Sequence, residues 1–258
     1  MTDLQNILPL WVLTLLFAAV LLASVVIGSR LRAYVTVDPA TAGSGQLLIG
    51  LVTVLSLLLG FTFSLALNRH DQRRDLLLEE ANAIQALHRT LVHVAQPGRA
   101  EIGTALHAYT RGRLMFVQSN LFAQAAQLEA RQQERARLNA VVAKVVPRSD
   151  TGVTQAQILI AATRILDAGA RMDMMSLEHV PARVVLVLHL LSTGAALVIG
   201  ISIGEKLRGL WLPTTIWSLL LSLVRFTIVD LDTSQWGSIR LNRAPLENAA
   251  RITADNGA

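Results

Sequence analysis

The sequence predicts an all-α membrane protein, with four transmembrane helices and a cytoplasmic helical bundle inserted between helices 2 and 3. The 258 residues are 52% hydrophobic and only 16% charged, and the apolar residues gather in four runs long enough to cross a bilayer. Between the second and third runs lies a more polar stretch with helical periodicity. We therefore divide the chain into transmembrane helices 1 and 2 (1–69), a cytoplasmic helical domain (70–180), transmembrane helices 3 and 4 (181–232) and a cytoplasmic C-terminal tail (233–258).

A membrane-spanning helix needs about 20 mostly apolar residues, and four segments meet this requirement: residues 8–28, 47–67, 184–204 and 210–229. The first segment is longer than the apolar core of a secretory signal peptide, and Asp3 precedes it in place of a basic start. We therefore expect a signal anchor that stays in the membrane. The fourth segment contains Pro213 and Arg225, yet its length still fits a span.

Basic residues near the span ends set the expected orientation, because cytoplasmic loops carry an excess of Lys and Arg. The two short connections on one side carry Arg30, Arg32, Lys206 and Arg208. The opposite side carries the larger set of Arg69, Arg73, Arg74, Arg171, Arg183, Arg240 and Arg243. Both termini and the central domain should therefore be cytoplasmic, in a multi-pass protein of the cell inner membrane.

The segment over residues 70–180 repeats apolar side chains at three- and four-residue steps, which is the period of amphipathic helices. No Gly or Pro separates this segment from the second span, so we expect that span to continue as one helix up to Pro97-Gly98. Three further helices are expected, over residues 99–117, residues 121–146, and residue 152 to Pro181. Together the four helices would form a bundle.

Small residues recur at four-residue spacing on two of the spans. They are Ser56, Gly60 and Ser64 on the second span, and Ser192, Ala196, Gly200 and Gly204 on the third. Small side chains let two helices approach closely in lipid, where dispersion and weak hydrogen bonds hold them together. The spacing therefore predicts helix-packing positions, and it leaves open whether these helices meet inside one subunit or between subunits.

The sequence contains no recognisable catalytic or metal-binding pattern. It has no cysteine, which excludes disulfides, thiolate metal sites and cysteine nucleophiles. The histidines form no HExxH pattern, and Glu79-Glu80 with His88 is better explained as a solvated helix face than as a metal site. GxSxG, P-loop and GxGxxG motifs are also absent. We therefore expect no enzyme activity, no bound metal and no cofactor.

The net charge of +5 does not indicate a nucleic-acid-binding protein, because the sequence has no compact basic run. Two ionisable residues inside the spans say more about function. Arg225 lies about one turn from the cytoplasmic end of the fourth span, and His189 lies at a similar depth in the third. We expect Arg225 to reach the interface or to pair with Asp230 or Asp232. We expect His189 to form a hydrogen bond between helices.

The junction after the second span reads LGFTFSLALNR from Leu59 to Arg69. It resembles the bestrophins, in which an LGF motif on the second helix precedes a short apolar run and an arginine. The continuation through Arg74 and Glu80-Ala81-Asn82, together with Asp230-Leu231-Asp232 and Gly237, is similar to a bacterial family of bestrophin-like membrane proteins. The order of these motifs around a helical insert agrees with that family.

Bestrophins are pentameric ion channels whose second helix lines the pore, so the resemblance implies a homo-oligomer of this kind. Animal members conduct anions and bacterial members conduct cations. The hydrophobic neck of the pore would fall on Thr53, Leu57 and Phe61, which share one helix face at four-residue spacing. Such a constriction gates by dewetting. Thr53 departs from the family, which prefers a large apolar residue at that position.

The C-terminal motif departs from the animal bestrophins as well. Those proteins bind calcium through an acidic run after the fourth span, whereas Ser238-Ile239-Arg240-Leu241 follows Gly237 in this chain. Asp230 and Asp232 are the acidic residues that match. The resemblance therefore does not carry a calcium site over to this sequence.

An oligomeric ion channel is the first functional expectation, with the lipid bilayer, further copies of the chain and inorganic ions as partners. A membrane-anchored scaffold or sensor with a cytoplasmic helical domain and no conductance is the alternative, because it needs the same four spans. The second span discriminates between them, since a pore helix turns one face away from lipid and from its own subunit.

Overall fold

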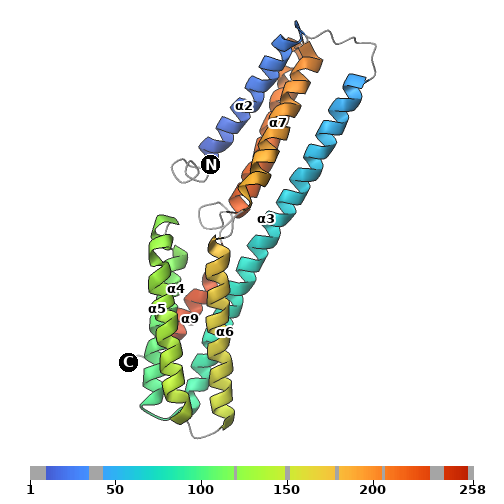
Figure 1. Cartoon of the computed structure of the whole chain (residues 1–258). Coiled ribbons are helices and arrows are strands. Elements are labelled where there is room, and N and C mark those ends of the chain that lie inside the picture. The colour runs from blue at the N-terminus through green and yellow to red at the C-terminus, as the bar shows by residue number, and fades with distance from the viewer. Residues whose placement is uncertain are drawn as a thin grey trace. The chain divides into compact units, whose positions relative to one another are not determined.

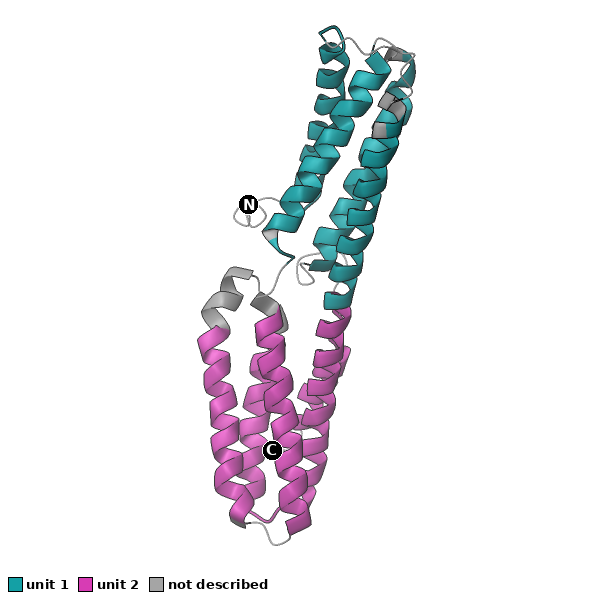
Figure 2. Ribbon diagram, turned by 45° about the vertical axis from the view of Figure 1, so that its right-hand side comes forward, with its two compact units in different colours: residues 1–69, 179–233 teal, residues 70–178, 234–258 magenta. Residues whose placement is uncertain are grey.

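The computed structural model describes residues 10–34, 43–118, 121–148, 152–177, 180–204, 207–232 and 241–254. Within these ranges the chain is helical apart from short turns and contains no strand, which confirms the predicted all-α class. Two compact units make up the chain, as Figure 2 shows. Unit 1 comprises Met1–Arg69 and His179–Thr233, and unit 2 comprises His70–Glu178 and Ser234–Ala258.

Among the described residues, four helices are long and apolar enough to cross a membrane, as predicted. They are α2 (Leu10–Leu31), the first half of α3 (Gly43–Thr90), α7 (Ala182–Ile203) and α8 (Leu207–Asp232) (Figure 1). The expected continuation of the second span is also observed, because α3 runs as one helix through Arg69 to Thr90. It ends earlier than the expected stop at Pro97-Gly98, and a 3-10 turn over Leu91–His93 follows it. Its first part belongs to unit 1 and its second part to unit 2.

Apolar side chains from all four helices meet in the core of unit 1. The buried members are Phe17, Leu21, Val25, Leu55, Leu188, Ala195, Ala196 and Leu221. α2 and α7 approach closely at Gly28 and Gly200, where a Cβ atom on either residue would collide with the facing backbone. The missing side chains at these two positions therefore set how near the two helices can lie.

Unit 2 is a helical bundle. It contains the second half of α3, the 3-10 turns η1 (Leu91–His93) and η2 (Val146–Arg148), and the helices α4 (Gly98–Gln118), α5 (Leu121–Val145), α6 (Gly152–Leu177) and α9 (Ala244–Ala254). The helices expected here begin and end within a few residues of the observed ones. Their inward side chains form one apolar core, which includes Leu87, Ile102, Leu106, Ile158 and Ile165.

Helix α9 differs from the C-terminal tail expected over residues 233–258. Leu246, Ala249 and Thr253 recur at three- and four-residue steps and are buried, because this spacing sets them on one side of a helix. α9 packs against α4, and both Leu246 and Ala249 belong to the apolar core of unit 2. Residues 244–254 therefore form part of the bundle.

Candidate functional site

The apolar part of α3 is the least buried of the four membrane-length helices. Only 11% of the residues in its most apolar stretch are buried within the chain, against 28% in α2, 28% in α7 and 33% in α8. Leu55, Thr62 and Ala66 are buried, and their spacing places them on one side of the helix. That side of α3 therefore packs inside unit 1, while the opposite side is exposed in the single chain.

The three expected pore-neck residues lie on the exposed side of α3. Leu57 is 63% exposed and Phe61 is 70% exposed. Thr53 is also exposed, and its hydroxyl donates a hydrogen bond to the carbonyl of Ile49 at 2.7 Å within the same helix. Their four-residue spacing sets them in one row along the helix. The described chain therefore leaves this row uncovered.

Small residues share the exposed side of α3. Ser56, Gly60 and Ser64 are all exposed, and a Cβ atom on Gly60 would meet no atom of a packed neighbour within 4 Å. The hydroxyl of Ser56 donates to its own helix, at 2.8 Å from the carbonyl of Val52. We name this surface the α3 outer face and define it as Thr53, Ser56, Leu57, Gly60, Phe61 and Ser64.

On α7 the small residues are packed inside unit 1 instead. The buried ones are Ser192, Ala196, Gly200 and Gly204. Gly200 faces the backbone of α2. Gly204 ends the helix with a φ of +53°, and beside it Arg32 donates a hydrogen bond to the carbonyl of Ser202 at 2.9 Å. An arginine at the C-terminal end of a helix satisfies carbonyls that have no partner within the helix.

The two ionisable residues expected inside the spans are in contact with each other. Arg225 donates from Nε to Nε2 of His189 at 3.0 Å, and Nδ1 of His189 lies 2.6 Å from the carbonyl oxygen of Val185. The ring of Phe17 lies against both, with its centroid 4.9 Å from the His189 ring and 4.9 Å from Cζ of Arg225. This group joins α2, α7 and α8 within unit 1.

The acidic motif at the end of α8 has other partners than expected. Asp232 accepts hydrogen bonds from the backbone N–H of Val180, at 3.1 Å to each carboxylate oxygen, and lies 3.9 Å from Nη1 of Arg69. Asp230 is buried. Within the described ranges no carboxylate pairs with Arg225, so the pairing expected with Asp230 or Asp232 is wrong. Asp232 joins the end of α8 to α3 and to the start of α7.

No metal site is visible in the part of the chain that the structure describes. It contains no group of three or more His, Asp or Glu side chains placed to hold a metal ion. The stretch from Gly237 to Arg240, where the sequence departs from the acidic run, lies outside the described residues.

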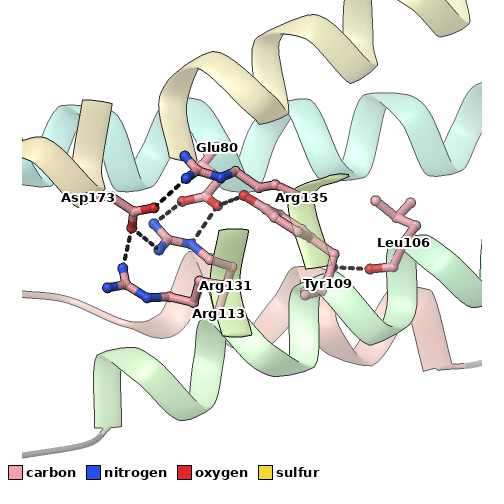
Figure 3. Close-up of polar contacts among 8 residues, drawn as sticks. Glu80, Leu106, Tyr109, Arg113, Arg131, Arg135 and Asp173 are labelled. Atoms are coloured by element: carbon pink, nitrogen blue, oxygen red, sulfur yellow. Dashed lines mark hydrogen bonds and ion pairs between the residues drawn. The ribbon is translucent and has the colours of Figure 1, made fainter. Parts of the chain in front are cut away.

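A buried cluster of charged side chains in unit 2 was missed by sequence reasoning (Figure 3). Glu80 of α3 is only 1% exposed. Its carboxylate accepts hydrogen bonds from Nε and Nη2 of Arg113 at 2.7 and 2.8 Å, and from the hydroxyl of Tyr109 at 2.5 Å. Two-pronged guanidinium–carboxylate pairs of this kind are strong and directional. They join α3 to α4.

Asp173 of α6 forms the second half of this cluster. It accepts a hydrogen bond from Nη1 of Arg113 at 3.2 Å and forms an ion pair with Nη2 of Arg135 at 3.0 Å, and Arg131 contacts the same carboxylate. The Cζ atom of Arg131 also lies 3.4 Å from the ring centroid of Phe116. We define the charge cluster as Glu80, Tyr109, Arg113, Arg131, Arg135 and Asp173. Its three guanidinium groups outnumber its two carboxylates, so one positive charge is in excess.

The charge cluster changes the acidity of its own members. Burial and the neighbouring Glu80 carboxylate raise the pKa of Tyr109 well above its usual value of 10.0. Burial is the largest single effect on Arg113 and lowers its pKa, but Glu80, Tyr109 and Asp173 together outweigh it and the pKa is raised. Tyr109 therefore remains a hydrogen-bond donor, and Arg113 remains charged, at every pH at which the protein is normally studied.

The free energy of unfolding is expected to fall at high pH because of Tyr109. An unfolded tyrosine loses its proton near pH 10, about its reference pKa, whereas folded Tyr109 keeps its proton. Above that pH the unfolded state binds fewer protons than the folded state, so stability decreases as pH rises. Denaturant unfolding in detergent at pH 9 and 11 measures this. Tyr109→Phe should lose most of the difference, and Tyr34→Phe, at a position 87% exposed, should retain it.

Comparison with known proteins identifies the fold. A family model described as the bestrophin-like domain matches residues 10–246. A crystal structure of a bacterial bestrophin homologue from Klebsiella pneumoniae, carrying one mutation, matches with a TM-score of 0.65 at 15% identity, over 95% of this chain and 98% of that chain. A second mutant of that homologue matches with a TM-score of 0.67 at 13% identity and the same coverage. The search of curated proteins found no match.

Proposed function

Because the chain belongs to the bestrophin-like family of membrane proteins, we propose that it assembles into a homo-oligomeric ion channel whose pore is lined by the α3 outer face. The oligomer is a pentamer in this proposal, as the resemblance to bestrophins implies, and inorganic ions are the permeant species. The protein lies in the cell inner membrane with both termini and unit 2 on the cytoplasmic side. Light scattering of the detergent-solubilised protein tests the assembly, because a monomer has no pore shared between subunits.

The exposure of the α3 outer face carries this proposal. A packed membrane helix turns its small residues toward a neighbour, as α7 does at Gly200. α3 instead turns Ser56, Gly60 and Ser64 away from its own subunit. Small or hydroxyl-bearing side chains contribute little favourable energy in contact with lipid tails. Next to another helix, small side chains allow close packing, and in a water-filled pore hydroxyl groups are hydrated. Further copies of the chain around one axis would cover the flanks of this face and leave its middle toward the pore.

Leu57 and Phe61 are the proposed gate within this pore. Rotational symmetry repeats each residue of the α3 outer face in every subunit. Leu57 and Phe61 then form two apolar rings about 6 Å apart along the axis, and Thr53 adds a hydroxyl ring one turn further on. A narrow apolar ring excludes water and therefore ions, so the conducting state requires this neck to widen.

Phe61→Ala is expected to raise the single-channel conductance or the open probability severalfold, because a small side chain lets water fill the neck. Recording from the purified protein in planar bilayers measures both quantities. Leu190→Ala is the matched control, since Leu190 of α7 is 63% exposed and lies outside the α3 outer face, and it should leave the current unchanged. Absence of current in both the wild type and Phe61→Ala would overturn the channel proposal.

A membrane-anchored scaffold or sensor is the second candidate, and one feature of unit 2 favours it. A groove of about 840 Å³ lies between α3 and α6. Asp75 and Glu79 of α3 and Arg164 of α6 are among the residues that line it, so it combines both charges with apolar side chains. This surface would contact a partner protein, and this candidate takes precedence if the purified oligomer passes no current.

A further inference from the structure

Two hydrogen bonds determine the protonation state of His189. Its Nδ1 atom lies 2.6 Å from the carbonyl oxygen of Val185, which can only accept, so Nδ1 carries a hydrogen atom. Its Nε2 atom lies 3.0 Å from Nε of Arg225, which can only donate, so Nε2 must offer its lone pair. Both contacts are satisfied by the neutral imidazole with its hydrogen on Nδ1 and by no other form of the ring.

Arg225 is the charged group that meets this imidazole. The apolar parts of α2 and α3 contain no ionisable side chain, and α2 contributes the edge-on ring of Phe17. On α7, Arg183 lies six residues before His189, and on α8, Asp230 lies five residues after Arg225. Neither is bonded to the pair in the described structure. Arg225 is only 8% exposed, so water screens its charge poorly.

We propose that the His189–Arg225 pair is a proton-binding site that controls how α8 packs against α7 and α2. A proton from the aqueous phase adds to the lone pair of His189 Nε2 and converts the imidazole to an imidazolium. The hydrogen bond from Arg225 then loses its acceptor, and two cations face each other across about 3 Å, where Coulomb repulsion is strong. Arg225 must move away, which takes its guanidinium off the ring of Phe17.

This proposal concerns the packing of unit 1 and does not depend on conductance. Histidine is the side chain whose ordinary titration falls between pH 5 and 8, so we expect the protonation of His189 to have its effect at mildly acidic pH. In the fold, a proton can add to Nε2 of His189 only when the hydrogen bond from Arg225 breaks, a cost that an unfolded chain does not have. The unfolded state then binds more protons, and the stability of unit 1 falls as pH decreases.

Thermal unfolding of the full-length protein in detergent at pH 7.5 and 5.5 tests the proposal. The wild-type melting temperature should fall by about 2–4 °C more than that of His189→Gln, in which an amide oxygen still accepts from Arg225 but does not titrate. His93→Gln is the matched control, because His93 is exposed in unit 2, and it should behave as the wild type. Equal falls in the wild type and His189→Gln would overturn the proposal.

A second variant and a local readout guard against a variant that fails to fold. Arg225→Gln removes the cation that opposes protonation, so its melting temperature should change less with pH than that of the wild type. Backbone hydrogen–deuterium exchange over residues 183–195, corrected for the intrinsic effect of pH, should show protection lost at pH 5.5 in the wild type only. Unchanged protection in the wild type would contradict the proposed loosening of α7 from α8.

Discussion

Glu80→Gln is expected to lower the free energy of unfolding of unit 2 by about 3–5 kcal/mol, the usual effect of removing one partner of a buried ion pair. The Glu80 carboxylate accepts two hydrogen bonds from Arg113 and one from Tyr109. Gln has nearly the same shape but only one accepting oxygen. Its NH₂ group would point a donor at a donor of Arg113, so at least one buried hydrogen bond is lost.

The excess positive charge of the charge cluster makes the expected loss of stability in Glu80→Gln larger. Three guanidinium groups share two carboxylates in the charge cluster, and Glu80→Gln leaves them with Asp173 alone. Arg113 is 4% exposed and Arg131 is 7% exposed at their side chains, so neither can recover hydration without opening the bundle. An excess buried charge of this kind is costly even when each group keeps one partner.

Hydrogen–deuterium exchange over the unit 2 helices, followed through a denaturant series in detergent, measures the effect. Glu79→Gln is the matched control, because Glu79 is the preceding residue and is exposed. It removes the same charge from the chain but breaks no bond of the charge cluster. We expect Glu79→Gln to unfold with the wild type and Glu80→Gln to unfold at a clearly lower denaturant concentration. Coincident transitions for the two variants would contradict the assigned role of Glu80.

The charge cluster also shows where prediction from one sequence stops. Glu80 lies three residues after Leu77 and four before Ile84, so the periodicity already places it on the buried side of α3. That pattern indicates burial without naming a partner. Its partners Tyr109 and Arg113 come from α4, and the second carboxylate comes from α6. Such pairings depend on how separate helices pack, which local sequence does not specify.

The four spans were predictable because each depends only on its own length and composition, as in the segment that became α2. Helix α9 was missed because its 11 residues give too short a pattern to separate a helix from a polar tail. The sequence identified an exposed face of the second span as the feature that separates a channel from a scaffold. It did not show that this face is exposed. The residues that cover the other side of α3, such as Ile228 and Leu231 of α8 beside Ala66, are far away in the sequence.

The partner of Arg225 was misassigned because nearness in sequence was taken for nearness in space. Asp230 follows it by five residues, which places the two on different sides of α8. Asp232 follows by seven residues, which is about 10.5 Å along the helix axis, and it is bonded to Val180. His189 lies 36 positions away but on the adjacent helix at the same depth.

Gly200→Ala is expected to lower the free energy of unfolding of unit 1 by about 1–3 kcal/mol or more, the range found for added atoms in a packed core. A Cβ atom at position 200 would collide with the carbonyl oxygen of Val25 and lie 3.0 Å from Cα of Gly28. These are backbone atoms of α2, which cannot rotate away as the end of a long side chain can. The two helices must move apart, and the core residues between them lose contact.

Gly194→Ala is the control that separates this collision from the general effect of replacing a glycine. Gly194 lies on the same helix, and a Cβ atom there would meet nothing within 4 Å. Alanine favours a helix over glycine by about 1 kcal/mol in an aqueous host, so this variant should be neutral or slightly more stable. In one detergent, the melting temperature should therefore fall for Gly200→Ala and stay the same or rise for Gly194→Ala. If the melting temperatures of both variants changed in the same direction by similar amounts, the close approach of α2 and α7 at Gly28 and Gly200 would not account for the stability of unit 1.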